Sequence, residues 1–135
     1  MSPVFDHEKL RAYQQALRFS AWVEPVLEGL PSRLAARDQL DRAATSIVLN
    51  IAEGNGKRSH PDRCRYLDIA RGSTVECAAC IDVLVVKNRL DVSLADEGKQ
   101  ILVGVVSMVA GLIARFSGEL HEDQAVYGAV ENENE

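Results

Sequence analysis

Apolar residues recur every three to four positions through four long segments of this chain. That spacing matches the 3.6-residue turn of an α-helix, whereas a β-strand would alternate apolar and polar residues. Breaks rich in Gly, Pro, Asn and Ser separate the segments at residues 29–32 and 54–59, and the chain is expected to turn again at residues 88–91. Because short connections make successive helices antiparallel neighbours, the pattern predicts an all-α protein that folds as an antiparallel four-helix bundle.

The expected helices run from His7 to Glu28, from Arg33 to Glu53, from about Ser59 to the turn at residues 88–91, and from Leu94 to Leu120. An oxygen-bearing side chain precedes each of them and can accept a hydrogen bond from an unpaired backbone N–H. The four expected capping residues are Asp6, Ser32, Ser59 and Ser93.

The length of 135 residues suits one domain, and 47% apolar with 26% charged residues is typical of a globular protein. A chain of this size buries enough surface to fold without a disulfide or a metal. We expect residues 1–120 to form the bundle. Residues 121–135 are acidic and weakly patterned, so they are expected to form a disordered tail.

The last expected helix is apolar over more of its circumference than one core contact requires. One face carries Ile101, Val105, Met108, Leu112 and Phe116, and small residues such as Gly104, Ser107, Gly111 and Ala114 accompany it. A second set is expected to lie off that face and to pack against another copy of the chain. Its members are Val103, Val106, Val109 and Ile113.

The formal net charge of −5 argues against a general nucleic-acid coat, but the charge is uneven. Residues 32–72 hold eight basic and five acidic side chains, a local charge of +3. Attraction between charges decays over roughly 8 Å in physiological salt, so a local basic surface on an acidic protein can bind a polyanion.

The longest uncharged apolar run, Gln100 to Ala114, lies between Lys99 and Arg115 and is shorter than the roughly 20 residues of a membrane helix. Charged residues at 6–9 interrupt any secretory apolar segment near the N-terminus. We therefore expect a cytoplasmic protein with no membrane partner.

The sequence contains few candidate residues for catalysis or metal binding. Cys77 and Cys80 form a CxxC pair without further ligands at metal-binding spacing, so Cys64, Cys77 and Cys80 are expected to be small buried residues. No catalytic motif occurs, and we expect no metal, no cofactor and no enzyme activity. The glycines, Lys57 and Arg58 before Ser59 leave two interpretations: a solvated turn, or a turn that contacts phosphate at a helix N-terminus.

A polar stripe runs along the second expected helix, where Arg42, Ser46, Asn50 and Glu53 follow three- and four-residue steps. Arg71, Gly72, Ser73 and Glu76 lie on the helix after it, and Arg42 is expected to approach Arg71 or Glu76. The stripe is either a solvated helix face or an organised polar network at a bundle or subunit interface, or a ligand surface.

These residues also form a motif of a known family. The second helix reads Gln39-x-x-Arg42-Ala43-Ala44-x-Ser46-Ile47-x-x-Asn50-Ile51-Ala52-Glu53-Gly54, and it resembles the signature of the bacterial four-helix-bundle family, the ribosomal-RNA intervening-sequence proteins. Arg58, Arg65-Tyr66-Leu67, Ile69-Ala70-Arg71-Gly72-Ser73 and Glu76 extend the resemblance, and so does Tyr13-Gln14-x-Ala16 near the start.

The resemblance implies an up-down-up-down bundle. It also implies similarity to the accessory variability protein of diversity-generating retroelements, a pentameric barrel that binds nucleic acid and a reverse transcriptase. Carried over to this chain, the structural motif comprises Gln39, Ser46, Asn50, Glu53, Gly54, Gly72, Ser73 and Glu76.

Two hypotheses for function follow. In the first, the chain is a homo-oligomeric scaffold, a pentamer by resemblance, whose basic surface contacts RNA or DNA. The residues expected to meet phosphates are Arg42, Lys57, Arg58, Arg63, Arg65 and Arg71. In the second, the chain is a protein–protein interaction module without a nucleic-acid role, and the polar motif serves assembly only.

Overall fold

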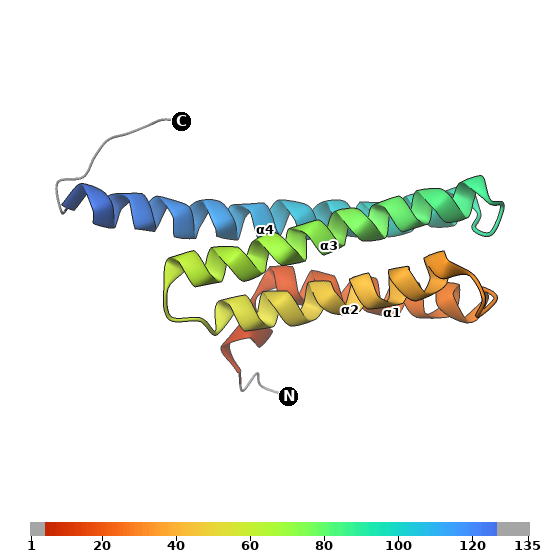
Figure 1. Ribbon diagram of the computed structural model, residues 1–135, viewed down its shortest axis with the longest axis horizontal. Coiled ribbons are helices and arrows are strands. Elements are labelled where there is room, and N and C mark those ends of the chain that lie inside the picture. The colour runs from red at the N-terminus through yellow and green to blue at the C-terminus, as the bar shows by residue number, and fades with distance from the viewer. Residues whose placement is uncertain (1–4, 127–135) are drawn as a thin grey trace.

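The computed structural model describes the backbone of residues 5–126 and the side chains of residues 5–118. It contains a short 3-10 helix, η1, and four α-helices, with bounds η1 Asp6–Lys9, α1 Arg11–Glu28, α2 Ala35–Asn55, α3 His60–Val86 and α4 Val92–Val126. Helices α1 and α3 each pack against both α2 and α4 (Figure 1). The all-α class and the antiparallel four-helix bundle are therefore confirmed, with no strand in the described residues.

The helix starts differ from the predicted ones for local reasons. Leu10 and Leu34 are extended, so α1 and α2 begin after them, and Ser32 does not cap α2. Asp91 replaces Ser93 as the cap of α4, because its Oδ2 atom accepts hydrogen bonds from the backbone N–H (3.1 Å) and the hydroxyl (2.5 Å) of Ser93. The cap at Ser59 is confirmed, since its hydroxyl accepts a bond from the Asp62 N–H at 3.2 Å.

The C-terminal end of α4 also differs from the prediction. The helix continues to Val126, so residues 121–126 are helical rather than part of a tail. Figure 1 shows this end of α4 extending past the first residues of α3. Residues 127–135, the rest of the expected tail, lie outside the described part of the chain.

The core is aliphatic and receives residues from all four helices. Its largest fully buried side chains are Phe19, Leu40, Ile47, Ile51, Leu67, Ile81, Leu84, Val105 and Val109. The prediction that Val109 lies off the core face is wrong, because Val109 is fully buried. It follows Val105 by four residues, about one helical turn, and therefore shares the core face with it.

Three helical glycines let neighbouring helices approach closely. A Cβ atom at Gly54 of α2 would lie 3.1 Å from the Cβ of Tyr66 in α3. A Cβ at Gly98 of α4 would overlap the indole of Trp22 in α1, and one at Gly104 would lie 3.0 Å from Nε2 of Gln15. These contacts set how α2 lies on α3 and how α1 lies on α4.

Candidate nucleic-acid interface and assembly surface

A small hydrogen-bond network joins α2 to α3. The Ser46 and Ser73 hydroxyls lie 2.8 Å apart. The Asn50 side-chain amide donates to the Ser46 carbonyl oxygen at 2.9 Å and to the Ser46 hydroxyl at 3.0 Å. Ser73 is buried, so its hydroxyl needs such a partner. For these three residues the interpretation as an organised polar network within the bundle is confirmed.

The outer members of the polar stripe face solvent. Arg42 was expected to approach Arg71 or Glu76, but its guanidinium pairs with Asp38 of its own helix at 3.2 Å, with both side chains largely exposed. Residues one turn apart on a helix are close neighbours, which favours this local pair. An exposed pair contributes roughly 0–1 kcal/mol. Arg42 and Glu53 border a shallow groove of about 400 Å³ along α2, lined by Asp41, Arg42, Thr45, Ser46, Leu49, Asn50 and Glu53.

The remaining motif residues divide into two kinds. Gly54 is buried where α2 meets α3, which explains a glycine at this position. Gln39, Gly72 and Glu76 are exposed. No described atom of a neighbouring residue lies within 4 Å of where a Cβ at Gly72 would stand. The packing of the single subunit therefore gives no reason for a glycine there.

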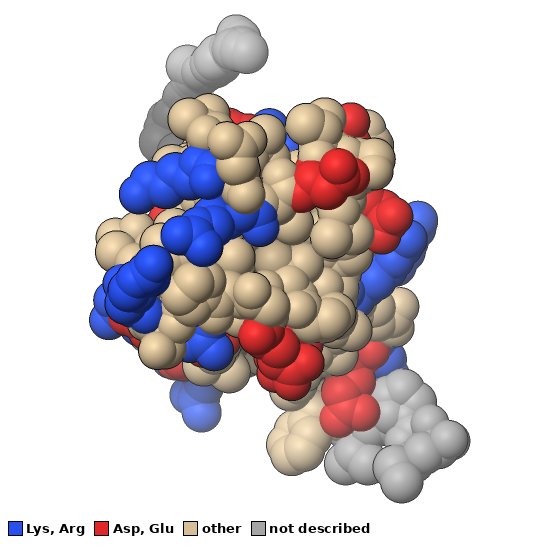
Figure 2. Space-filling view, turned by 90° about the vertical axis from the view of Figure 1, so that its right-hand side faces the viewer, with Lys and Arg blue, Asp and Glu red and all other residues tan. Residues whose placement is uncertain are grey.

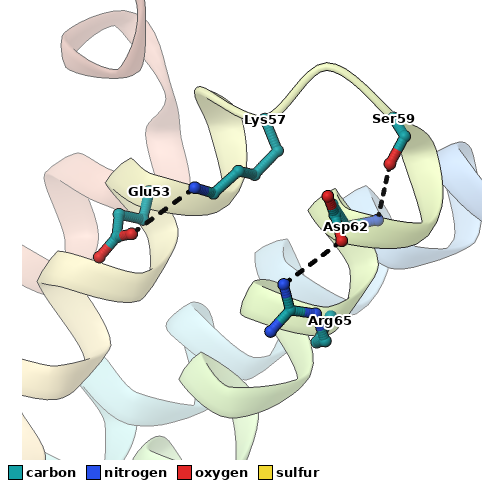
Figure 3. Close-up of polar contacts among 5 residues, drawn as sticks. All are labelled: Glu53, Lys57, Ser59, Asp62 and Arg65. Carbon is teal, nitrogen blue, oxygen red and sulfur yellow. Dashed lines mark hydrogen bonds and ion pairs between the residues drawn. The ribbon is translucent and has the colours of Figure 1, made fainter.

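Four of the six predicted phosphate-binding residues gather at the turn between α2 and α3, namely Lys57, Arg58, Arg63 and Arg65. Figure 3 shows how part of this basic turn is arranged. Glu53 lies 3.8 Å from Lys57, and Asp62 lies 3.3 Å from Arg65. The Ser59 cap leaves the first turn of α3, with its partial positive charge, beside these cations.

Two aromatic rings support the basic turn. The Lys57 ammonium and the Arg65 guanidinium lie 4.9 and 4.8 Å from the ring centre of Tyr66. The Arg63 guanidinium lies 4.9 Å from the ring of Phe116, while its Nε donates to the Lys57 carbonyl at 2.8 Å. Such cation–π contacts hold each cation over the face of a ring, so these side chains are already ordered before any ligand binds. The hydrogen bond to Asp62, followed by Tyr66, raises the pKa of Arg65 above its ordinary value.

Sequence reasoning missed both rings. Tyr66 directly follows Arg65 and could have been noticed, whereas Phe116 is distant in sequence and only the fold brings it to Arg63. Arg42 and Arg71 lie apart from the basic turn. Arg42 stands 13 residues before the end of α2, roughly 20 Å along the helix. Within residues 5–118, neither Arg58 nor Arg71 forms an ion pair.

The opposite end of the bundle has mixed charge. This end carries the α1–α2 and α3–α4 connections, and Figure 2 shows Lys and Arg gathered on one side of it and Asp and Glu on the other. Lys87 and Arg89 belong to the α3–α4 connection, and both are exposed. Lys87 and Arg89 are therefore two exposed cations at the end of the bundle opposite the basic turn.

The cysteines have the character of core residues. Cys77 and Cys80 are buried on α3, as predicted, whereas Cys64 is half-buried and its Sγ lies 3.7 Å from the Ser117 hydroxyl. Burial raises the pKa of Cys77 to about 12, and the Cys80 thiol and Glu76 carboxylate act in the same direction. Burial likewise raises the pKa of Cys80. Within the described residues, no three His, Cys, Asp or Glu side chains gather as a metal site.

The predicted assembly residues lie in different places. Val103 is 61% exposed, Val106 and Ile113 are half-buried, and Val109 belongs to the core. The ion pair between Asp82 and Lys99 and the contact between Cys64 and Ser117 set the antiparallel register of α3 and α4. That register brings Val75 of α3, 58% exposed, level with Val106. An exposed apolar surface therefore extends from α4 onto α3.

Helix α4 is apolar enough to be compared with a membrane-spanning helix. Residues Val92–Gly118 have the length and composition of a membrane span, with a mean hydropathy of 1.9 in the most apolar window. A single such helix is weak evidence, because the core helix of a soluble protein meets the same criterion. Only 28% of that window is buried, so much of the apolar surface of α4 is left uncovered by the described part of the chain.

Comparison with known proteins agrees with the motif. Residues 8–111 match the family of 23S rRNA-intervening sequence proteins, and this region is more than half of the chain. A crystal structure of a protein of unknown function from the S23 ribosomal protein family of Bacteroides thetaiotaomicron has the same fold. Its TM-score is 0.71 at 18% identity, over 76% of this chain and 97% of that one. A comparison with curated proteins gives no match, and similarity to the accessory variability protein is not shown. The four-helix bundle agrees with this match, and the match over residues 8–111 places this chain in the 23S rRNA-intervening sequence protein family.

Proposed function

We propose that this protein is a cytoplasmic homo-oligomeric scaffold that binds RNA or DNA through the basic turn between α2 and α3. The proposal is for binding and not for catalysis. Five copies is the number that the family resemblance implies. The observation that carries the proposal is the gathering of Lys57, Arg58, Arg63 and Arg65 at one turn of an otherwise acidic chain.

The arrangement of the turn suits phosphates. Side chains held over rings lose less freedom on binding than free ones, and Lys57 and Arg65 both lie on Tyr66. Arg58 forms no ion pair with a described residue, so its charge is available to a ligand. Several turns brought together in an oligomer would multiply weak contacts into a stable complex.

The apolar surface of α3 and α4 supports assembly. Val75 and Val103 are both more than half exposed, and Val106 lies half-buried between them. Contiguous exposed apolar patches on soluble proteins usually mark contacts with another protein. A second copy is the partner proposed here, because homo-oligomers are the commonest soluble assemblies.

A salt titration by filter binding tests the nucleic-acid part of the proposal, with single-stranded RNA and duplex DNA as separate probes. Each phosphate contact contributes a log–log slope of about −0.7 for a single strand and −0.9 for duplex DNA. The Lys57→Ala/Arg58→Ala variant is expected to bind more weakly with a shallower slope. The matched control, Lys87→Ala/Arg89→Ala, removes the same charge from the opposite end and is expected to bind as the unchanged protein does.

The alternative is a protein–protein interaction module. It is favoured by the ion pairs that Arg42, Lys57 and Arg65 already form with Asp38, Glu53 and Asp62. An intact oligomer that binds neither probe at low salt would reject the nucleic-acid proposal and support this alternative. Light scattering combined with the 260/280 nm absorbance ratio of purified protein reports assembly and bound nucleic acid in one measurement.

A further inference from the structure

One phenylalanine ring of this chain is exposed, and it lies immediately before η1. Phe19 and Phe116 are buried and belong to the core, whereas the Phe5 side chain is 64% exposed. An aromatic ring contributes to folding mainly through the large apolar surface that it buries, and the Phe5 ring buries little. The ring can therefore contact a ligand from outside the subunit.

Phe5 is nevertheless held in a defined place. Its ring stacks on that of His7, with ring centres 5.7 Å apart and ring planes 20° from parallel. The His7 ring meets Tyr13 of α1 edge-on, at 4.7 Å between centres, and Tyr13 packs against the core. The Phe5 backbone N–H also donates to Oε2 of Glu8 at 3.2 Å. Phe5, His7 and Tyr13 thus form an aromatic ladder that fixes the exposed ring on the bundle.

The aromatic ladder lies at the same end of α2 as the basic turn. Asn55, the last residue of α2, donates through its side-chain amide to Oδ2 of Asp6 at 3.0 Å. Asp6 lies between Phe5 and His7 in the chain, and Asn55 precedes Lys57 by two residues. Since successive Cα atoms are about 3.8 Å apart, this bond keeps the exposed ring within a few residues' length of the first cation. Figure 1 shows η1 beside the end of α2 at which the turn begins.

Charged groups of both signs surround the aromatic ladder. Asp6 and Glu8 are acidic and Lys9 and Arg11 are basic, so residues 5–11 have no formal net charge with the histidine neutral. Both acids accept hydrogen bonds within the subunit. The positive charge that attracts a polyanion therefore comes from the basic turn, and the contribution of the ladder is an aromatic surface.

Cations beside an exposed aromatic ring are the combination by which proteins bind a single strand of nucleic acid. The cations contact phosphates, while unpaired bases stack on the aromatic side chains. Every base has a flat face, so this contact tolerates any sequence. In a duplex the bases are already stacked on one another, and a side chain reaches their faces only at the cost of unstacking them. The arrangement therefore favours a single strand over a duplex.

We propose that Phe5 stacks on a base of a single-stranded nucleic acid whose phosphates contact the basic turn. This inference rests on the proposed function and narrows its ligand from RNA or DNA in general to a single strand of either. Phe5 supplies the contact to the base, and His7 packs against the Phe5 ring and holds it in position. The basic turn supplies the contacts to phosphate.

Filter binding with Phe5→Ala tests the proposal, with single-stranded RNA, single-stranded DNA and duplex DNA as separate probes. Loss of the ring is expected to weaken binding of both single strands about five-fold or more. The log–log salt slope is expected to stay unchanged, because no charge is removed. Binding of the duplex is expected to change little. The variant is expected to keep the circular dichroism of a folded bundle, since the ring is exposed and outside the core.

Two control variants accompany Phe5→Ala. Phe5→Tyr keeps an aromatic ring and is expected to bind single strands as the unsubstituted protein does. Val86→Ala trims a side chain that is 81% exposed at the opposite end of α3, and it is expected to leave binding of all three probes unchanged.

Fluorescence of Phe5→Trp reports the base contact directly. The unsubstituted chain has one tryptophan, Trp22, whose indole lies against Gly98 of α4, toward the opposite end of the bundle. A base stacked on an indole quenches its fluorescence. Single-stranded RNA is therefore expected to quench the emission of Phe5→Trp and to leave that of the unsubstituted protein nearly unchanged.

The outcomes separate this inference from the proposed function. An unsubstituted chain that binds none of the three probes rejects both. If the unsubstituted chain binds single strands, and Phe5→Ala binds them equally well, the base contact is overturned while phosphate binding at the basic turn stands. Equal losses on duplex and single strands, absence of quenching in Phe5→Trp, or an unsubstituted chain that binds only the duplex would likewise overturn it.

Discussion

The hydroxyl of Ser46 on α2 lies 2.8 Å from the hydroxyl of Ser73 on α3, and Asn50 donates to the same Ser46 oxygen. This network joins three residues of the motif by which the sequence resembles its family, namely Ser46, Asn50 and Ser73. It lies between two helices that the Gly54 contact brings close together, with the basic turn at one end of both. The packing of α2 on α3 therefore also positions the proposed phosphate-binding residues.

The first prediction concerns coupling within this network. Ser46→Ala and Ser73→Ala are each expected to lower the free energy of unfolding by about 1 kcal/mol, because each leaves a polar partner unsatisfied. The double variant is expected to lose less than the sum, with a coupling of about 0.5–1 kcal/mol. Urea denaturation of the four proteins measures the cycle. Strictly additive losses would show that the two hydroxyls do not interact.

Gly54→Ala is expected to destabilise the bundle by about 1–3 kcal/mol, although alanine favours helix formation, because overpacking forces neighbouring backbone apart. The new methyl group would lie 3.1 Å from the Tyr66 Cβ and 3.3 Å from the Arg63 carbonyl oxygen. Gly56→Ala is the matched control, since its Cβ would meet nothing closer than 3.5 Å, and it is expected to change stability little. Equal thermal midpoints for the two variants would contradict the close contact.

A third prediction uses Trp22, the only tryptophan of the chain. Its indole lies against Gly98 of α4, and its Nε1 donates to Glu97 at 3.2 Å. Gly98→Ala is expected to push the ring outward, shift its fluorescence emission to longer wavelength and lower stability by about 1–3 kcal/mol. Emission that stays unchanged in a folded variant would show that α1 and α4 do not meet at this position.

The fourth prediction is a pH dependence. The folded pKa of Cys77 is about 12, above the ordinary value of 9.0. Between these values the unfolded chain has lost the thiol proton while the folded chain retains it, so unfolding becomes easier as pH rises. The stabilisation is complete below about pH 9 and is lost as pH rises toward 12.

Urea denaturation at pH 8 and pH 10 measures this effect. The unsubstituted protein is expected to lose more stability between the two values than Cys77→Ala, which has no thiol to titrate at that position. Cys64→Ala is the control, because it removes another thiol of α3 and leaves Cys77 in place, and it is expected to follow the unsubstituted protein. Identical losses in all three proteins would contradict a raised pKa at Cys77.

Much of the candidate site could be anticipated from short-range patterns. Ser46, Asn50 and Glu53 lie at helical spacing, and the cap at Ser59 depends only on residues within one turn. Ser32 and Ser93 matched the same capping pattern and do not cap, because Leu34 and Asp91 begin those helices instead. Patterns of this kind propose several local solutions of similar energy, and packing against the rest of the bundle selects among them.

The cation–aromatic contacts show more clearly which features the sequence alone does not predict. Arg65 and Tyr66 are adjacent in sequence, yet nothing local indicates that Lys57 reaches the same ring. Arg63 meets Phe116 across more than fifty residues of chain, so their contact depends on how α4 lies against α3. Sequence reasoning found the charges of the basic turn but not what holds them in place.

Periodicity and composition alone establish four helices, their order and the excess of apolar surface on the last one, because the helical repeat is a property of the local backbone. Tertiary structure decides which part of that surface is buried. Val109 enters the core, whereas Val103 remains exposed. Burial depends on the lateral register of helices distant in sequence, and no local pattern encodes that register.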